Sequence, residues 1–261
     1  MDNEGAVNPE GFFMLKMMAE GGDFESQKSL AYMYFQGEDI NQNIDQSLFW
    51  SNVAISHEEC NEEEMLTISS RIGEIFMIHK DYEGALKKFT FIFESANLDP
   101  LMKDHAHAAI ADAHYHLKDG KAMEIYEYIV NRQHPVVADD IKKYSYGRLG
   151  TIYMEKKDFK EAIGAFHKSV GPEKQADAIH LNSLGYANEM YGNFNEARKY
   201  YLLASEKGSL FANLNLGYLY DNGLGVEADS SKAFMYYEKG ADCLEEWRTA
   251  REKFGVEKSD K

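Results

Sequence analysis

Apolar residues recur along the chain with a period that predicts helices. In segments 79–89, 155–166 and 190–201, an aspartate or asparagine precedes an aromatic residue, an alanine follows three residues later, and a second aromatic lies four residues further on. Asp and Asn are typical helix N-caps, and residues four apart lie on one helical face. Each segment therefore predicts the start of a helix that buries its alanine and second aromatic. These pairs are Ala85 with Phe89, Ala162 with Phe166, and Ala197 with Tyr201.

Two of these helix starts also carry a glutamate three residues after the predicted N-cap. Glu161 follows Asp158 at this distance, and Glu196 follows Asn193. In a capping box, such a glutamate accepts a hydrogen bond from the backbone of the N-cap residue. The spacing therefore predicts a capping box at both positions.

A second helix is predicted upstream of each start, because a glycine lies twelve residues before each alanine. A glycine inside a helix costs about 1 kcal/mol relative to alanine, so its recurrence indicates that the paired helix approaches closely. A looser copy occurs within residues 108–129, where Ala111, Ala122 and Tyr126 take the same roles. The recurring glycines are Gly73, Gly150 and Gly185.

The helix pair near the C-terminus has a longer turn. Gly217 and Ala233 hold the two small positions, but the extra residues GLGV, at 223–226, lie between them. We expect Gly223 to end the first helix by adopting a positive φ. A phosphate-binding loop would need a lysine followed by serine or threonine, or a GxGxxG after a strand, and the sequence has neither here.

These spacings carry a resemblance to two families of helical repeats. The small–small–aromatic pattern resembles the tetratricopeptide repeat, whose period is about 34 residues. The variant with the longer turn resembles the Sel1-like repeat, and residues 30–50 match residues 216–236 in this form. The resemblance implies one all-α, right-handed α-solenoid over residues 1–261, with about six helix pairs. Its expected parts are an N-terminal helix and Sel1-like repeat at 9–58, tetratricopeptide-like repeats at 60–207, a Sel1-like repeat at 208–241 and a capping helix at 242–255.

Composition limits the cellular compartments and the classes of partner that we expect for this chain. The formal net charge of −16 repels phosphate backbones and anionic lipids, so we expect neither nucleic acid nor membrane as a partner. The acidic N-terminus does not resemble a secretory signal, and no apolar run approaches the roughly 20 residues of a membrane span. The two cysteines, Cys60 and Cys243, do not form a disulfide framework. We therefore expect a soluble cytoplasmic protein, and the charge favours a basic partner.

A histidine cluster in residues 103–119 is the strongest candidate for a metal site. On a helix, His105, Asp112 and His116 share one face, while His107 and His114 share the opposite face. Of these residues, Asp112 and His116 alone have the i, i+4 spacing that suits zinc, and two ligands do not complete a site. We expect no metal, but a polar lining on one face and packed histidines on the other.

Catalytic groups are equally sparse. Cys60 lies three residues after His57, but five nearby glutamates would raise the pKa of its thiol and disfavour the nucleophilic thiolate. The chain also lacks the GxSxG motif of a serine nucleophile. We therefore predict no catalytic residue, no cofactor and no enzymatic activity.

What remains is a binding surface. In both repeat families the first helices of successive pairs line a concave groove, so the resemblance implies a groove that holds a protein or peptide. The first pair would extend this groove through Lys28, Tyr32 and Gln36. We expect the segment 242–255 to cap the last repeat, with Leu244, Trp247 and Phe254 on one stripe and Trp247 in the core. The expected groove residues are Arg71, Glu74, His105, Asp112, His116, Tyr144, Arg148, Asn182, Tyr186, Glu189, Tyr218 and Asp221.

The sequence favours a non-catalytic scaffold or adaptor that binds a protein or peptide partner. An alternative, which the acidity and size also suit, is a bacterial immunity or inhibitor protein that neutralises a basic toxin. A third hypothesis is a hydrolase whose active site has no known motif. The sequence leaves the oligomeric state open.

Overall fold

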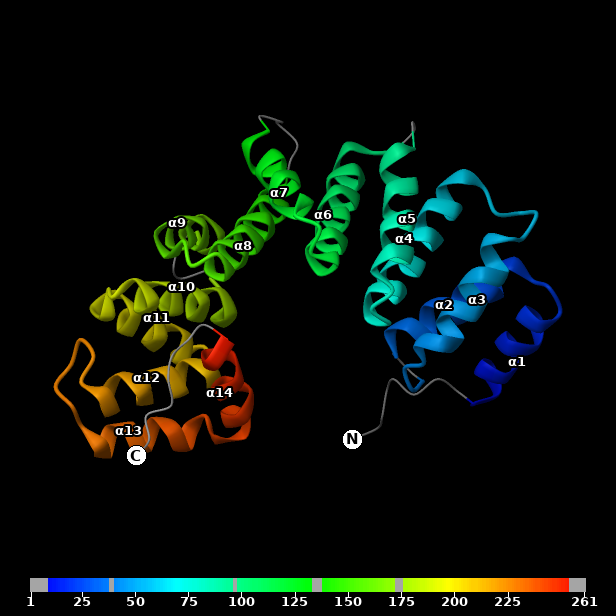
Figure 1. Ribbon diagram of the computed structural model, residues 1–261. Helices are drawn as coiled ribbons and strands as arrows, with labels where there is room; N and C mark the ends of the chain where they lie inside the picture. The colour runs from blue at the N-terminus through cyan, green and yellow to red at the C-terminus, as the bar shows by residue number, and fades with distance from the viewer. Residues whose placement is uncertain (1–8, 38–39, 96–97, 133–137, 172–175, 254–261) are drawn as a thin grey trace. The chain divides into compact units, whose positions relative to one another are not determined.

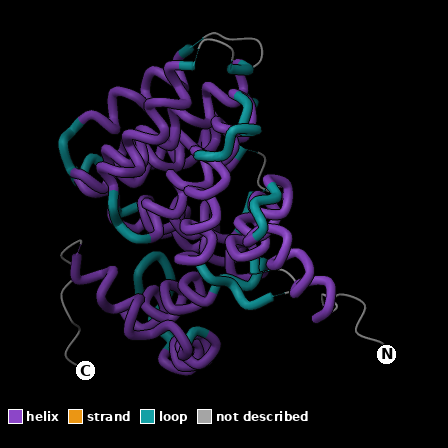
Figure 2. The backbone as a smooth tube through the Cα atoms, turned by 90° about the vertical axis from the view of Figure 1, so that its right-hand side faces the viewer, coloured by secondary structure: helices purple, strands orange, loops and turns teal. Residues whose placement is uncertain are grey.

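The structure is a computed structural model that describes residues 9–37, 40–95, 98–132, 138–171 and 176–253. Within these ranges the backbone forms helices joined by turns, with no strand (Figure 2). The chain divides into two compact units, Met1–Ile125 and Tyr126–Lys261, and the helix α7 (Lys121–Asn131) runs across the boundary. In each unit consecutive helices pack against each other, which confirms the predicted all-α solenoid architecture (Figure 1).

The first unit contains the helices of the N-terminal half. Its core begins where Leu30 and Ala31 pack against Trp50, and continues through Ile72 to Phe89. Its helices are α1 (Pro9–Glu20), α2 (Phe24–Gln36), α3 (Ile44–Ile55), α4 (Glu62–Ile78), α5 (Tyr82–Glu94) and α6 (Pro100–Leu117).

The second unit holds a larger continuous core. This core runs from Met154 through Phe166, Leu184 and Tyr201 to Leu219. Its helices are α8 (Asp139–Glu155), α9 (Phe159–Val170), α10 (Ala178–Tyr191), α11 (Phe194–Glu206), α12 (Leu210–Asn222), α13 (Ser230–Lys239) and α14 (Leu244–Lys253), with a 3₁₀ turn, η1 (Ala241–Cys243), before the last.

The predicted close approach of paired helices is confirmed. A Cβ atom added to Gly73 would lie 2.6 Å from the ring of Phe89, and one added to Gly150 would lie 2.6 Å from the ring of Phe166. A Cβ atom added to Gly185 would likewise lie 2.6 Å from the ring of Tyr201. In the pair α12 and α13, a Cβ atom added to Gly217 would lie 2.7 Å from the ring of Tyr237. In these pairs the missing side chain makes room for an aromatic ring of the second helix.

Helix caps agree with the sequence in part. Asp81 caps α5, and its side chain accepts a hydrogen bond from the backbone of Gly84. Asp158 and Asn193 hold the N-cap positions of α9 and α11, but neither side chain makes a cap hydrogen bond, so the predicted capping boxes are wrong. Backbone ψ does not separate these residues from Asp81, because Asp81 caps α5 with a ψ of 73°, close to the 64° of Asp158 and the 61° of Asn193.

The long turn after α12 has the geometry expected of its glycines. Gly223 ends α12 with φ of 65°, in the left-handed region, and Gly37 ends α2 in the same way with φ of 72°. Gly225 has φ of 66° as well, and a Cβ atom there would lie 2.7 Å from Cβ of Phe194. The turn of one pair thus contacts the first residue of α11 in the preceding pair.

Replacing Gly223 with alanine should test this cap. A Cβ atom at Gly223 would meet Ala228 at an ordinary 3.5 Å, so the cost comes from the positive φ. We expect a loss of about 1–2 kcal/mol in the free energy of unfolding, measured by urea denaturation. Gly223→Asn should cost less, because asparagine tolerates this conformation better. Equal stability of the alanine variant and the wild type would contradict the cap.

No helix within the described ranges combines the length and apolar character needed to cross a membrane.

Candidate functional site

In the first unit, α2 and α4 present a hollow of about 600 Å³ that brings together several expected groove residues. The guanidinium carbon of Arg71, on α4, lies 5.5 Å from the ring centroid of Tyr32, on α2. Nζ of Lys28 lies 2.6 Å from Oε1 of Glu64. Burial lowers the pKa of Arg71, and its Nη1 atom is buried without a hydrogen-bond partner among the described residues. The hollow therefore contains an arginine with unused hydrogen-bonding capacity.

Other expected residues of this region lie at the surface. Glu74, one turn along α4 from Ser70, is exposed, and the Ser70 hydroxyl donates to it at 3.4 Å. Gln36, at the end of α2, is exposed as well. These two side chains are available to a partner but do not line the hollow.

The histidines of α6 differ in exposure and in their contacts. His105 is exposed, Asp112 is half-buried, and His116 is exposed with its ring stacked on Tyr82 at 4.7 Å. His107 stacks on Phe93 at 4.6 Å, and Phe93, like Tyr82, belongs to α5. His114 is buried, with Nδ1 2.6 Å from Asp119 Oδ2. The described residues contain no group of three or more His, Cys, Asp or Glu placed to hold a metal ion.

Cys60 does not have the setting of a nucleophile. Burial, and then the charge of Glu64, raise the pKa of its thiol, and the smaller effect of the Lys28 charge opposes them. The imidazole of His57 is engaged elsewhere, with Nε2 3.0 Å from the carbonyl oxygen of Gly22. The electrostatic effect expected from the glutamates therefore appears in the structure, chiefly through one of them.

In the second unit, α8 places Tyr144 at the surface and leaves Arg148 half-buried. Nε of Arg148 donates to the hydroxyl of Tyr126 at 3.3 Å. These two residues therefore differ in how much of their side chains is available to a partner.

Three of the expected groove residues of α10 and α12, namely Tyr186, Glu189 and Tyr218, lie against α14. Glu189 on α10 is 6% exposed, because Arg251 of α14 covers it, with Nη2 2.5 Å from Glu189 Oε1. The guanidinium carbon of Arg251 also lies 3.8 Å from the ring centroid of Tyr218 on α12, and 5.6 Å from that of Tyr186 on α10. Asp221, at the end of α12, is exposed. Where the sequence predicted an open lining, α14 of the same chain covers Tyr186, Glu189 and Tyr218.

Side-chain amides complete this buried cluster. Asn215 Oδ1 accepts hydrogen bonds from Trp247 Nε1 at 2.6 Å and from Arg251 Nη1 at 3.3 Å. Nδ2 of Asn215 donates to Asn182 Oδ1 at 3.0 Å. The hydroxyl of Tyr201, which is fully buried, donates to Glu189 Oε2 at 2.7 Å. The cluster thus joins α10, α11, α12 and α14 in one polar network.

The electrostatics of the cluster hold its charges in place. Burial alone opposes the charge of Arg251, but the Glu189 carboxylate outweighs this effect and raises the pKa of Arg251 above its usual range. Burial, and then Glu189, raise the pKa of Tyr201. Burial also raises the pKa of Tyr186 to about 12. Both phenols are therefore neutral near pH 7, while Arg251 stays charged.

Sequence reasoning missed Arg251 and Asn215, although it expected Trp247 to be buried. Trp247 is 8% exposed, which confirms that expectation, and Leu244 is half-buried. Phe254, the third member of the expected stripe, lies outside the described residues. The available signal was an arginine four residues after the tryptophan, on the same helical face. Arginine is rarely fully buried unless it is paired, so that signal is weak by itself.

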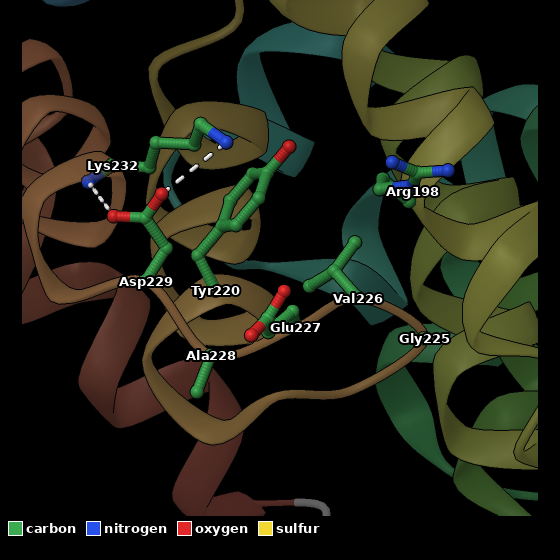
Figure 3. A pocket seen from close by; sticks show the side chains of 8 residues that line it. All are labelled: Arg198, Tyr220, Gly225, Val226, Glu227, Ala228, Asp229 and Lys232. Carbon is green, nitrogen blue, oxygen red and sulfur yellow. Dashed lines mark hydrogen bonds and ion pairs between the residues drawn. The ribbon is translucent and has the colours of Figure 1, made fainter.

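The turn after α12 borders a second hollow, of about 500 Å³ (Figure 3). Arg198 lies on one side of it, and Asp229 and Lys232 form an ion pair of 3.2 Å on the other. Asp229 is also the N-cap of α13 and accepts from the backbone of Lys232. Glu227 lies between the two sides. This hollow carries both positive and negative side chains. Asp229 and Lys232 already interact with each other at the N-terminus of α13.

One family model matches parts of the chain. The Sel1 repeat model matches residues 25–57, 179–209 and 210–243. The first and third matches include the long turns, whereas the second covers α10 and α11, whose connecting turn is short. A comparison with curated proteins finds no match.

Solved structures show the same fold at low sequence identity. A Sel1 repeat protein from Oxalobacter formigenes is 16% identical, with a TM-score of 0.54, and the match covers 91% of each chain. The C-terminal part of a TPR repeat-containing protein from Cytophaga hutchinsonii is 17% identical, with a TM-score of 0.60, over 88% of this chain and 83% of that one. MamA from Desulfovibrio magneticus RS-1 is 14% identical, with a TM-score of 0.54, over 72% of this chain and 98% of that one.

Proposed function

We propose that this chain, which carries Sel1 repeats in a Sel1 and tetratricopeptide type of fold, is a non-catalytic scaffold that binds a protein or peptide partner. The observation that supports this most is the position of α14. It lies on α10 and α12, the first helices of two successive pairs, and inserts one aromatic and one arginine side chain between their residues. A surface that holds a helical segment of its own chain has the shape and chemistry to hold a helical segment of another.

The hollow between α2 and α4 supports the same function in the first unit. Tyrosine and arginine are the residue types most often found as binding hot spots, and Tyr32 and Arg71 lie together here. The buried Nη1 of Arg71 would gain a hydrogen bond from a carbonyl or carboxylate oxygen of a partner. Glu25 and Glu63 at the edge of the hollow favour a partner that also carries basic side chains.

The proposed compartment is the cytoplasm. Cys60 and Cys243 are both free thiols, which suits a reducing environment. The formal net charge of −16 favours a basic protein over nucleic acid or an anionic lipid surface as the partner.

Affinity capture from the source organism's lysate tests the proposal. The baits are the wild type, a Tyr32→Ala, Arg71→Ala variant, and a matched control, Lys87→Ala with Phe91→Ala, which removes an exposed cation and an exposed aromatic from α5. We expect mass spectrometry to show a partner that the wild type and the control recover equally. The Tyr32→Ala, Arg71→Ala variant should recover at least about ten-fold less of this partner.

Thermal melting of all three baits by circular dichroism checks that they are folded at the temperature of capture. If the three folded baits recover every protein equally, the hollow between α2 and α4 is not the binding surface. If the wild type enriches no protein, the scaffold function is contradicted.

A further inference from the structure

Two side chains hold α14, the last helix within the described residues, against the repeats. Its sequence, LEEWRTAREK, is mostly polar, and within residues 244–252 only Trp247 and Arg251 are buried. Their neighbours Arg248, Thr249 and Glu252 are exposed. Residues four apart lie on one helical face, so the helix presents an aromatic and an arginine to α10 and α12, while Leu244 at its start is half-buried.

The surface beneath α14 contains a complete set of partners for a guanidinium group. Glu189 supplies a carboxylate 2.5 Å from Arg251 Nη2, and Asn215 Oδ1 accepts from Arg251 Nη1. The ring of Tyr218 lies 3.8 Å from the guanidinium carbon, within the range of a cation–π contact. A planar group with several fixed donors suits this arrangement, whereas a lysine ammonium would lose the planar stacking and part of the hydrogen bonding.

These partners are positioned by groups that do not belong to α14. The buried Tyr201 hydroxyl, from α11, donates to Glu189 Oε2, and Asn182, from α10, accepts a hydrogen bond from Asn215. The carboxylate and the amide therefore keep contacts from the repeat helices when α14 is absent. Preorganised partners of this kind lower the entropic cost of binding an incoming group.

We infer that the surface formed by Glu189, Asn215 and Tyr218 is a binding site for an arginine that a partner protein presents on a helix, with an aromatic residue four positions before it. The helix α14 occupies this site as an internal ligand. The partner binds when α14 detaches from α10 and α12. A ten-residue helix is marginally stable alone, and α14 is anchored by one helical turn, so a partner helix with the same pair of side chains competes with it. This inference rests on the proposed scaffold function and names the partner chemistry of one of its surfaces.

Peptide binding to the full chain tests the site. The probe is a fluorescently labelled peptide with the sequence of residues 244–253, and anisotropy measures its dissociation constant. The wild type is compared with Trp247→Ala, Arg251→Ala, which frees the internal helix, and with the matched control Arg248→Ala, which changes an exposed arginine on the same helix.

We expect the freed variant to bind the peptide at least about ten-fold more tightly than the wild type and the control. Adding Glu189→Gln to the freed variant should reverse this gain, because it removes the carboxylate but keeps the shape. A peptide in which lysine replaces the arginine equivalent to Arg251 should bind about ten-fold more weakly. Equal binding by the wild type and the freed variant, or binding that Glu189→Gln leaves unchanged, would overturn the inference.

A second measurement covers the case in which the freed variant does not fold. Hydrogen exchange of the wild-type chain is followed with and without saturating unlabelled peptide. Displacement of α14 should speed exchange of the amides in residues 245–252, and the lysine peptide should not. Unchanged exchange would overturn the inference. If the peptide experiments fail but a partner is captured through Tyr32 and Arg71, the proposed scaffold function stands without this site. If the peptide experiments and the affinity capture both fail, the scaffold function is contradicted.

Discussion

Replacing Glu189 with alanine is expected to lower the free energy of unfolding of the second unit by about 3–5 kcal/mol, because removal of one partner from a buried ion pair leaves the other uncompensated. Both side chains are almost fully buried, at 4% exposure for Glu189 and 6% for Arg251. The substitution also removes the acceptor of the fully buried Tyr201 hydroxyl. Tyr201 belongs to the core between α10 and α11 and cannot turn to solvent without disrupting it.

Urea denaturation followed by far-UV circular dichroism would measure this loss. Glu196→Ala, on the exposed surface of α11, is the matched control and should change stability by at most about 0.5 kcal/mol. Arg251→Ala should cost less than Glu189→Ala, because α14 can detach and let water reach the carboxylate. If Glu189→Ala cost no more than the control, the network would not stabilise the unit.

Replacing Gly150 with leucine should destabilise the second unit by about 1–3 kcal/mol through overcrowding. Even the first added carbon would lie 2.6 Å from the ring of Phe166, which is 4% exposed and enclosed by the core. The partner helix cannot yield by turning one flexible side chain, because the obstacle is a packed ring. The helices α8 and α9 would have to move apart.

Gly164 offers a matched control on the partner helix α9. A Cβ atom there would meet nothing within 4 Å, and the position is exposed. Gly164→Leu should therefore leave the melting temperature unchanged or raise it, because leucine has the higher helix propensity. The contrast between the two variants isolates close packing from propensity. Equal melting temperatures for Gly150→Leu and the wild type would contradict the role of the glycine.

Features that depend on short spacings were predictable from the sequence. Gly150 and Phe166, like Gly185 and Tyr201, fall on facing helices of one hairpin, so the intervals between them define the contact. Gly223 was predictable for a similar reason, since a glycine at the end of an apolar helix is a common C-terminal cap. The capping boxes at Asp158 and Asn193 failed as predictions although Asp81, with a similar backbone conformation, does cap its helix, so the residue spacing alone does not decide whether a side chain reaches an amide.

The candidate site shows the opposite case. Glu189 has the position of a groove residue in its helix, and the sequence could place it there. Its burial depends on Arg251, which lies 62 residues further along the chain. No period links these two residues, because one belongs to a repeat and the other to the segment after the repeats. The prediction of an exposed lining was therefore reasonable for α10 by itself and incomplete for the unit.

The sequence by itself determined the helices, their pairing and the residues that pack between them, because burial of an apolar face imposes a periodic pattern on neighbouring residues. Only the tertiary structure decided which of the inner surfaces holds a segment of the chain itself. Buried polar groups need specific partners, and a partner can come from any element that reaches the same place in space. Trp247 and Arg251 of α14 are such partners, because they bind the buried Asn215 and Glu189. As a result, α14 covers a surface that the sequence predicted to be open.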